Sequence, residues 1–275
     1  MIMLIIIFFI IIILIYYIFN YKKKYLLIHE NDFKYIKEYL ECYPEFNIKL
    51  YKDNEIIYDN FNEYICVRRI PQILENNSKY ISSHYLAIFD GPKFINIDKN
   101  KLSFLNLDQL SNNHDFNAIN NFIKKFNIKY YDYSLHNINL IGFGTYLPYK
   151  YNLSEIIKLK KFLNVLKIYD VIIVGTESSR RNKIVDQLME KKINIIFISN
   201  IFGDARDKII GKAKILLNIH GEDNFKIYEN IRCERWRFAG ITIISENCID
   251  HVPKEIITSN YENISDTVIN VLKKI

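Results

Sequence analysis

The alternation of apolar and polar segments across residues 170–246 constrains the fold of this chain more than any other feature. Short apolar runs at 171–174, 195–199, 215–219 and 241–245 each lead into a polar turn, and stretches with helical spacing separate them. Strands that alternate with helices in this way predict a parallel sheet. Open parallel sheets bind ligands at the carboxyl ends of their strands, where the polar residues of this segment collect. The segment therefore predicts a site for a nucleotide or another anionic ligand.

Helical patterns fill the rest of the C-terminal half. Apolar Ile184, Val185, Leu188 and Met189 share one face of a helix, and Gly240 is placed to end another. Further helices are predicted over residues 155–166, 206–214, 225–239 and 267–274. We therefore expect residues 151–275 to form a C-terminal Rossmann-like domain with an α/β fold.

The N-terminal half has a less regular pattern that still mixes both element types. Strands are predicted at residues 85–89, 94–97, 102–107, 128–131 and 138–141, and a helix at 117–126. Gly142, Gly144 and Pro148 then interrupt the pattern, which places a domain boundary near residue 150. Residues 25–150 are expected to form a smaller N-terminal α/β domain.

The first 19 residues carry no charged side chain and consist almost entirely of Ile, Leu, Phe and Tyr. A helix of this length rises about 30 Å, the thickness of the hydrocarbon layer of a bilayer. Residues 1–20 are therefore predicted to be a single transmembrane anchor. A cleaved signal peptide is the alternative, but a basic leading region and a small-residue cleavage site are both missing. Lys22, Lys23 and Lys24 follow the anchor, which predicts a cytosolic globular part beside anionic headgroups.

Charge and cysteine content narrow the classes of partner. The net charge of +6 comes from scattered lysines without a basic and aromatic stripe, so nucleic acid is not an expected partner. Cys42, Cys66, Cys233 and Cys248 show neither disulfide nor metal spacing, in agreement with a reducing compartment. No metal and no cofactor are predicted.

The turn after the run at 171–174 is the first candidate site. Gly175 allows a close backbone approach, and Ser178 can cap the helix that follows. Free amides at a helix start attract phosphate oxygens, and Arg180 or Arg181 could add a forked contact to a diphosphate. The alternative is a capped helix with a solvated arginine pair.

The ends of the next two strands supply the remaining candidates. Asn218 and His220 end the run at 215–219, and Glu246 ends the run at 241–245. His220 could orient a sugar or phosphate oxygen, or be a structural histidine; it has no second metal ligand at useful spacing. Glu229 and Arg232 share a helix face, where the carboxylate could accept both hydroxyls of a ribose. An ion pair within the helix is the alternative for these two residues.

Three further side chains were considered for binding or catalysis. Trp236 could stack on a base, although a position in the core is the simpler interpretation. His84 and Asp90 are the only guesses for a base on the acceptor side. The catalytic residues are otherwise unassigned.

The C-terminal pattern resembles glycosyltransferases of the two-domain GT-B type, in particular those of large DNA viruses and some bacteria. The resemblance covers roughly residues 100–260 and depends on the strand ending at 218–220, the helix with Glu229, and the strand ending at 245–246. The other matching pieces are residues 106–111, 132–134 with Asn137, 146–149, 175–181 and 206–207.

The resemblance implies that a membrane-anchored enzyme transfers a hexose-type sugar from a nucleoside diphosphate donor to an unidentified hydroxyl, without a metal. It also implies that Glu229 holds the ribose and that Arg180 or Arg181 meets the diphosphate. The chain departs from the pattern at Gly221, where many retaining enzymes carry the first of two glutamates, and at Asp108, where an acidic residue follows Leu instead of Thr. The alternatives are a catalytically inactive GT-B-like scaffold or nucleotide-binding protein at a membrane, and a structural protein without a ligand.

Overall fold

The computed structural model describes residues 9–11, 24–58, 63–74, 90–95, 97–110 and 113–275. The segment predicted as a membrane anchor lies almost wholly outside these residues, and so do His84 and the strand predicted at 85–89. Within the described ranges, no helix is both long and apolar enough to cross a membrane.

The N-terminal half is built on a six-stranded sheet in which every neighbouring pair is parallel. The strand order is β2 (Phe46–Tyr51), β1 (Lys24–His29), β4 (Glu63–Val67), β7 (Leu102–Asn106), β8 (Lys129–Asp132) and β9 (Thr145–Tyr146). A second parallel sheet joins β3 (Ile56–Tyr58), β6 (Asp90–Ile95) and β5 (Ile70–Leu74). The N-terminal half, expected to be the smaller, therefore carries the wider sheet.

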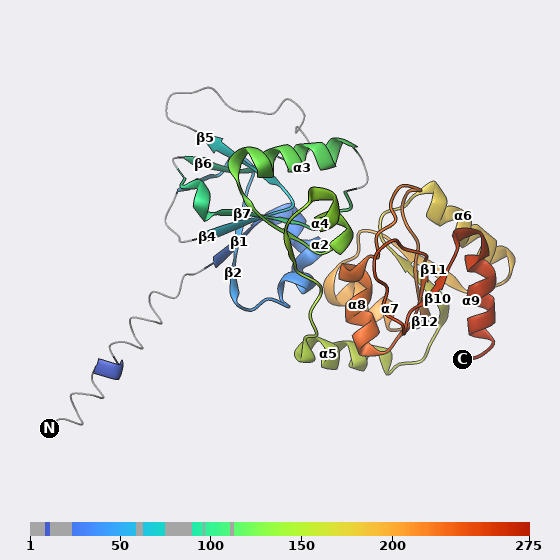
Figure 1. The fold of residues 1–275 in the computed structure, drawn as a ribbon. Helices are drawn as coiled ribbons and strands as arrows, with labels where there is room; N and C mark the ends of the chain where they lie inside the picture. Colours follow the sequence, from blue (N-terminus) through green and yellow to red (C-terminus); the bar gives the residue numbers. More distant parts are fainter. Residues whose placement is uncertain (1–8, 12–23, 59–62, 75–89, 96, 111–112) are drawn as a thin grey trace.

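Helices cover both faces of the six-stranded sheet (Figure 1). Helix α2 (Glu30–Leu40) packs Ile36 and Leu40 on the face that includes Leu26 and Ile28. Helix α3 (Asn113–Phe126) packs on the opposite face, which includes Leu27. Neighbouring residues of a strand point to opposite faces, so continuous apolar runs are what a sheet covered on both sides requires.

The C-terminal half contains a five-stranded parallel sheet, in agreement with the alternation in its sequence and with a Rossmann-like fold. The strand order is β11 (Ile195–Ile198), β10 (Tyr169–Val174), β12 (Ala213–Asn218), β13 (Thr242–Glu246) and β14 (Ile257–Ser259). One face is covered by α5 (Leu153–Leu163), α7 (Gly203–Ile210) and α8 (Asn230–Ala239), and the other by α6 (Ser179–Glu190) and α9 (Ile264–Leu272).

One predicted strand is wrong. Residues 138–141 belong to helix α4 (Leu135–Ile141), which begins at the N-cap Ser134 and ends at Gly142. The Ser134 hydroxyl accepts a hydrogen bond from the Asn137 amide, and Gly142 has a φ of 92°. The sequence pattern at 138–141 does not distinguish a helix from a strand, because periodicity cannot separate the two over so few residues.

The helix predicted over 225–239 begins later than expected. Helix α8 starts at Asn230, and Glu229 is its N-cap residue. Gly240, with a φ of 99°, ends the helix as predicted. Glu229 therefore lies on the loop that enters the helix.

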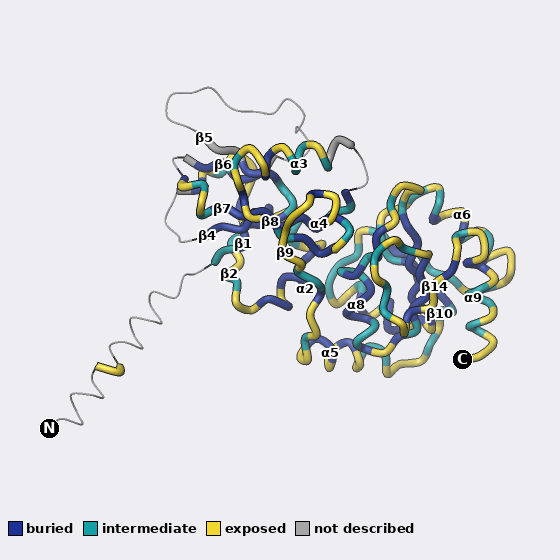
Figure 2. Tube along the Cα trace, viewed as in Figure 1, coloured by how far each residue is buried: buried dark blue, intermediate teal, exposed yellow. Residues whose placement is uncertain are grey.

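Buried residues form the centre of each sheet, and the two halves also pack against each other (Figure 2). Ile227 and Ile231 from the C-terminal half belong to the same apolar cluster as Leu105 and Tyr133. The Tyr39 hydroxyl also donates to the carbonyl oxygen of Leu147, in the segment that connects the halves, at 2.6 Å. Apolar packing therefore holds the two halves together, and a hydrogen bond from α2 fixes the segment that connects them.

Candidate functional site

A cavity of about 580 Å³ lies between the two halves of the chain. Its C-terminal wall comes from the segments that follow β10, β11 and β12, represented by Gly175, Asn200 and Gly221. Its N-terminal wall comes from residues that follow β4 and β7, represented by Arg68 and Asp108, together with α2. The carboxyl ends of both parallel sheets thus face one cavity, the position at which open α/β sheets bind ligands.

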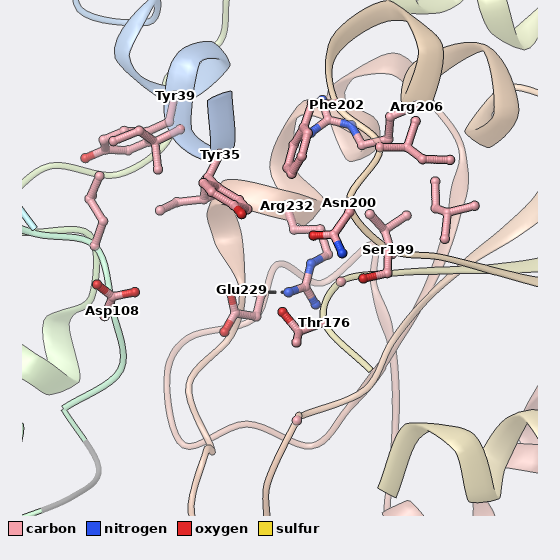
Figure 3. Close-up of a pocket in the computed structure, with 18 of the residues that line it drawn as sticks. Tyr35, Tyr39, Asp108, Thr176, Ser199, Asn200, Phe202, Arg206, Glu229 and Arg232 are labelled. Carbon is pink, nitrogen blue, oxygen red and sulfur yellow. Dashed lines mark ion pairs between the residues drawn. The ribbon is translucent and has the colours of Figure 1, made fainter. Parts of the chain in front are cut away.

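Figure 3 shows how the side chains divide across this cavity. Tyr35, Tyr39 and Asp108 lie on one side, and Ser199 and Phe202 on the other. Of the predicted site residues, Gly175, Ser178, Arg181, Glu229 and Arg232 line the cavity. Arg180, Asn218, His220 and Glu246 are not among its lining residues.

Arg181 is the most unusual cation of the cavity. Its side chain is 6% exposed, and its guanidinium donates to the carbonyl oxygens of Ile219 at 2.9 Å and Thr176 at 2.6 Å. Burial, and then the neighbouring charge of Arg232, lower the pKa of Arg181 to about 10. A buried cation held by neutral carbonyl groups is costly, and an anion in the cavity would offset that cost.

Arg232 stands beside Arg181 at the glycine turn. A Cβ atom on Gly175 would lie 2.9 Å from a guanidinium nitrogen of Arg181 and 3.3 Å from one of Arg232. Arg232 donates to the Asn218 side-chain oxygen at 3.0 Å, and its nearest carboxylate oxygen, on Glu229, is 3.9 Å away. Gly175 has a φ of 148°, so the missing side chain permits both the backbone conformation and the approach of two cations.

The start of helix α6 faces the same turn. Ser178 is the N-cap residue, and its hydroxyl accepts a hydrogen bond from the Arg181 amide at 3.3 Å, as the sequence predicted for a capping hydroxyl. The partial positive charge of a helix N-terminus adds to that of the two guanidinium groups. The turn at 175–178 therefore combines a helix N-terminus with the guanidinium groups of Arg181 and Arg232, and we call this group the diarginine site.

Arg180, the other predicted diphosphate ligand, points elsewhere. Its guanidinium forms two hydrogen bonds with the Glu246 carboxylate and one with Asp223, and it stacks on the Tyr261 ring at 3.9 Å. The two carboxylates balance the positive charge of Arg180 within the C-terminal half. Glu246 is correspondingly occupied by this ion pair and by the His220 amide at 3.1 Å.

Asn218 and His220 have structural surroundings. Asn218 is fully buried, with its amide donating to the Ser245 hydroxyl at 3.0 Å and its oxygen accepting from Arg232. His220 is 2% exposed, and one ring nitrogen lies 3.2 Å from the carbonyl oxygen of Asn247. Burial lowers the pKa of His220, which favours a neutral ring. Asn218 therefore orients Arg232, whereas His220 makes no contact with the cavity.

Glu229 is fixed by a residue of the other half of the chain. The Gln109 amide donates to the Glu229 carboxylate at 2.6 Å, and the Gln109 oxygen accepts the Ile227 amide at 3.0 Å. Glu229 retains 23% side-chain exposure, so part of its carboxylate faces the cavity. Gln109 belongs to the segment 106–111 that carries part of the family resemblance, but the sequence assigned it no role; it lies two residues after the predicted strand at 102–107.

Three further arginines that line the cavity form ion pairs. Arg68 forms a forked ion pair with Asp108 at 2.8 and 2.9 Å, and Arg206 donates to Glu38 at 2.7 Å across the two halves. Arg235 is held by Glu155 and Asp207 in a buried network. Arg68 also has a φ of 64°, a conformation that is rare without glycine and that is often found at binding sites. Arg181 has no ion pair among the described residues. Arg232 forms an ion pair with Glu229 at 3.9 Å, the alternative that the sequence left open, and Glu177 and Glu222 also line the cavity.

Two further candidates from the sequence, Trp236 and Asp90, contribute no assigned contact to a ligand. Trp236 is 1% exposed and belongs to the apolar core, as its simpler interpretation predicted. The side chain of Asp90 is not described. Among the described residues, no cluster of three or more His, Cys, Asp or Glu side chains could hold a metal ion.

The most informative comparison is with a protein of Acanthamoeba polyphaga mimivirus. The uncharacterized protein L140 is 35% identical over 229 residues, which make up 82% of this chain and 70% of that protein. The chain belongs to the L140 family. The uncharacterized proteins L138 and L137 of the same virus are each 30% identical over 236 and 221 residues. The matched region covers only 26% of L138 and 28% of L137.

The remaining comparisons do not indicate a function for the chain. No family model matches the chain. The crystal structure of GsuK bound to ADP covers 92% of this chain and 70% of its own, at 12% identity and a TM-score of 0.24. That likeness is too low to carry an argument about fold or ligand.

Proposed function

We propose that the chain binds a nucleoside diphosphate sugar in the cavity between its two sheets and transfers the sugar to an acceptor hydroxyl, as a GT-B-like glycosyltransferase. The observation that carries the proposal is the diarginine site. Arg181 and Arg232 converge on a glycine turn and a helix N-terminus without a strongly bound carboxylate. A diphosphate supplies the charge that this arrangement lacks.

The cavity also suits the rest of such a donor in size and polarity. A volume of about 580 Å³ lies within the range of 300 to 1,000 Å³ that is usual for small-molecule sites. Glu229 lines the same wall as Arg232 and keeps 23% side-chain exposure, which supports the role of ribose acceptor that the family resemblance implies. The opposite wall is left for the acceptor.

In this mechanism the bond between the anomeric carbon and the diphosphate oxygen breaks as the acceptor oxygen bonds to that carbon. The leaving diphosphate takes the electron pair, and Arg181, Arg232 and the amides at the start of α6 stabilise the charge that develops. Glu229 and Gln109 position the nucleoside without touching the reacting bond. The acceptor proton needs a base, and that residue stays unassigned.

Binding without transfer is the second candidate function, and one observation favours it. Glu38 and Asp108, the acidic residues of the N-terminal wall, each form an ion pair with an arginine. A carboxylate stabilised by such a pair is a weak base. The chain would then be a nucleotide-binding scaffold with the same donor site.

The membrane part of the proposal depends on the sequence alone. The uncharged apolar segment at 1–20, followed by Lys22, Lys23 and Lys24, would anchor the cavity next to a membrane on the cytosolic side. Glycan, lipid and protein acceptors are all compatible with that location.

The proposal is tested by titrating the full chain with uridine, guanosine, adenosine and cytidine diphosphates and their hexose conjugates. A ligand present at 100 times its Kd should raise the free energy of unfolding by about 2.7 kcal/mol. Release of the nucleoside diphosphate from its sugar conjugate distinguishes transfer or hydrolysis from binding alone. Glu229→Ala should weaken binding by about 1–3 kcal/mol. A folded chain that binds none of these compounds would contradict both candidate functions.

A further inference from the structure

Several polar side chains of the cavity have no hydrogen-bond partner within the described part of the chain, and three of them are uncharged and lie close to Arg232. They are Thr176, next to the diarginine site, and Ser199 and Asn200, directly after β11. Figure 3 shows these three side chains around Arg232. Hydrogen-bonding groups that line a cavity and have no partner in the protein are available to a ligand. The two after β11 are uncharged, so the charges of the site do not account for them.

Asn200 is held in an unusual backbone conformation. Its φ of 57° falls in the left-handed region, which asparagine tolerates better than most residues other than glycine. Its exposed side chain presents one amide, which offers a donor and an acceptor side by side. The edges of most nucleobases present the complementary pair of groups.

Phe202 occupies a position where a different residue would stabilise the fold more. It is the N-cap residue of α7, and no side chain caps this helix. Ser, Thr, Asp or Asn at an N-cap is worth about 1 kcal/mol more than a residue that cannot accept a hydrogen bond. Such a local conflict between sequence and structure is typical of functional positions.

The Phe202 ring meets an aromatic residue from the other half of the chain. Tyr35 of α2 contacts Phe202 edge to face, with ring centroids 4.7 Å apart and an interplanar angle of 82°. Tyr35 is 45% exposed, so part of this aromatic pair is accessible to a ligand. The Lys34 ammonium lies 5.2 Å from each ring centroid. Both rings line the cavity and are more accessible than Trp236, another lining residue, which is 1% exposed and packed in the core.

We infer that Tyr35, Ser199, Asn200 and Phe202 form the subsite for the nucleobase of the donor. The base stacks on the aromatic pair while the Asn200 amide bonds to its edge. This inference rests on the proposed function, because the diarginine site and Glu229 fix the diphosphate and ribose next to this subsite. Since Tyr35 belongs to the N-terminal half and Phe202 to the C-terminal half, both halves contact the base.

The test compares, in the full chain, the Kd for each nucleoside diphosphate with the Kd for inorganic pyrophosphate. The ratio of the two isolates the contribution of the nucleoside. Asn200→Gly and Phe202→Leu should each raise the ratio of the Kd for a nucleoside diphosphate to the Kd for pyrophosphate at least fivefold, a conservative value for base stacking and edge recognition. The affinity for pyrophosphate should stay within about twofold. Asn200→Asp should shift the preference toward guanosine diphosphate, because guanine presents two adjacent donors to a carboxylate.

Asn54→Gly is the matched control. Asn54 is also an exposed asparagine in the left-handed conformation, with a φ of 63°, but it lies outside the cavity. Its replacement should leave both affinities unchanged.

The two proposals fail in different ways. Wild-type protein that binds neither pyrophosphate nor any nucleoside diphosphate would overturn both of them. An unchanged ratio in Asn200→Gly and Phe202→Leu, together with loss of pyrophosphate binding in Arg232→Gln, would overturn the base subsite and leave the diarginine site in place. Variants that bind every nucleoside diphosphate normally but lose transfer to an acceptor would also overturn it, because this surface would then hold the acceptor.

Discussion

Replacing Arg181 by methionine should abolish tight diphosphate binding without unfolding the protein. Methionine has a similar length and flexibility, so the change removes the charge and the two hydrogen bonds while keeping most of the packing. Arg181 is 6% exposed and is held only by the carbonyl oxygens of Ile219 and Thr176 among the described residues. The two effects on stability therefore oppose each other.

The structure allows each effect to be estimated. Burial and the charge of Arg232 lower the pKa of Arg181 to about 10, which corresponds to about 3 kcal/mol of destabilisation of the buried cation. Two hydrogen bonds from a charged donor contribute about 1.5 kcal/mol each in the opposite direction. The free energy of unfolding of Arg181→Met should therefore stay within about 1 kcal/mol of the wild type. Loss of a charged contact to the diphosphate should weaken binding by about 2 kcal/mol, or roughly 30-fold in Kd.

The neighbouring residue provides the control. Arg180→Met leaves Glu246, which is 7% exposed, without its cation, so the free energy of unfolding should fall by about 3 kcal/mol. The affinity of the folded Arg180→Met protein for diphosphate should stay close to that of the wild type. Urea unfolding and calorimetric titration with pyrophosphate measure the two quantities. Normal pyrophosphate binding by Arg181→Met would refute the assignment of the diarginine site.

Three further predictions concern other parts of the structure. Gly175→Ala places a Cβ atom 2.9 Å from a cavity guanidinium and should weaken pyrophosphate binding at least tenfold. The control Gly142→Ala has nothing within 4 Å of its Cβ and should cost only about 1 kcal/mol of stability. Equal affinities for pyrophosphate in both variants would contradict this prediction. Gln109→Leu frees the Glu229 carboxylate and should weaken nucleoside diphosphate binding about five- to tenfold in a titration, with little change for pyrophosphate. Burial raises the pKa of Asp132 to about 7, above its value in the unfolded chain, so the native state holds an extra proton between about pH 4 and 7. This contribution to stability is complete below about pH 4 and is lost as the pH rises through about 7; urea unfolding from pH 4 to 8 should show a slope that is absent in Asp132→Asn.

The C-terminal sheet could be predicted because each of its strands is an apolar run bounded by polar turns. Strands β10 to β13 carry their hydrophobic residues on both faces, and a sheet covered by helices on both sides demands that pattern. The strand prediction at 138–141 is wrong because a run of four residues with three apolar side chains fits a helix and a strand equally well. The Ser134 cap and Gly142 were the signals that favoured a helix.

The choice between Arg180 and Arg181 could not be made from the sequence. Adjacent residues of a helix point about 100° apart, so only one of them can face a given cavity. The packing of α6 turns Arg181 toward the glycine turn and Arg180 toward Glu246 on β13. Residues of the N-terminal wall, such as Gln109, reach Glu229 only through the packing of the two halves, and no local pattern reports that contact.

The position of a bound nucleotide tests the central claim most directly. A crystal structure of the full chain with its best-bound nucleoside diphosphate would show that position. The diphosphate should contact Arg181, Arg232 and the turn at 175–178, and the ribose hydroxyls should lie within hydrogen-bond distance of Glu229. A nucleotide bound elsewhere, for example in the cavity of about 490 Å³ beside Tyr146 and His251, would contradict the account.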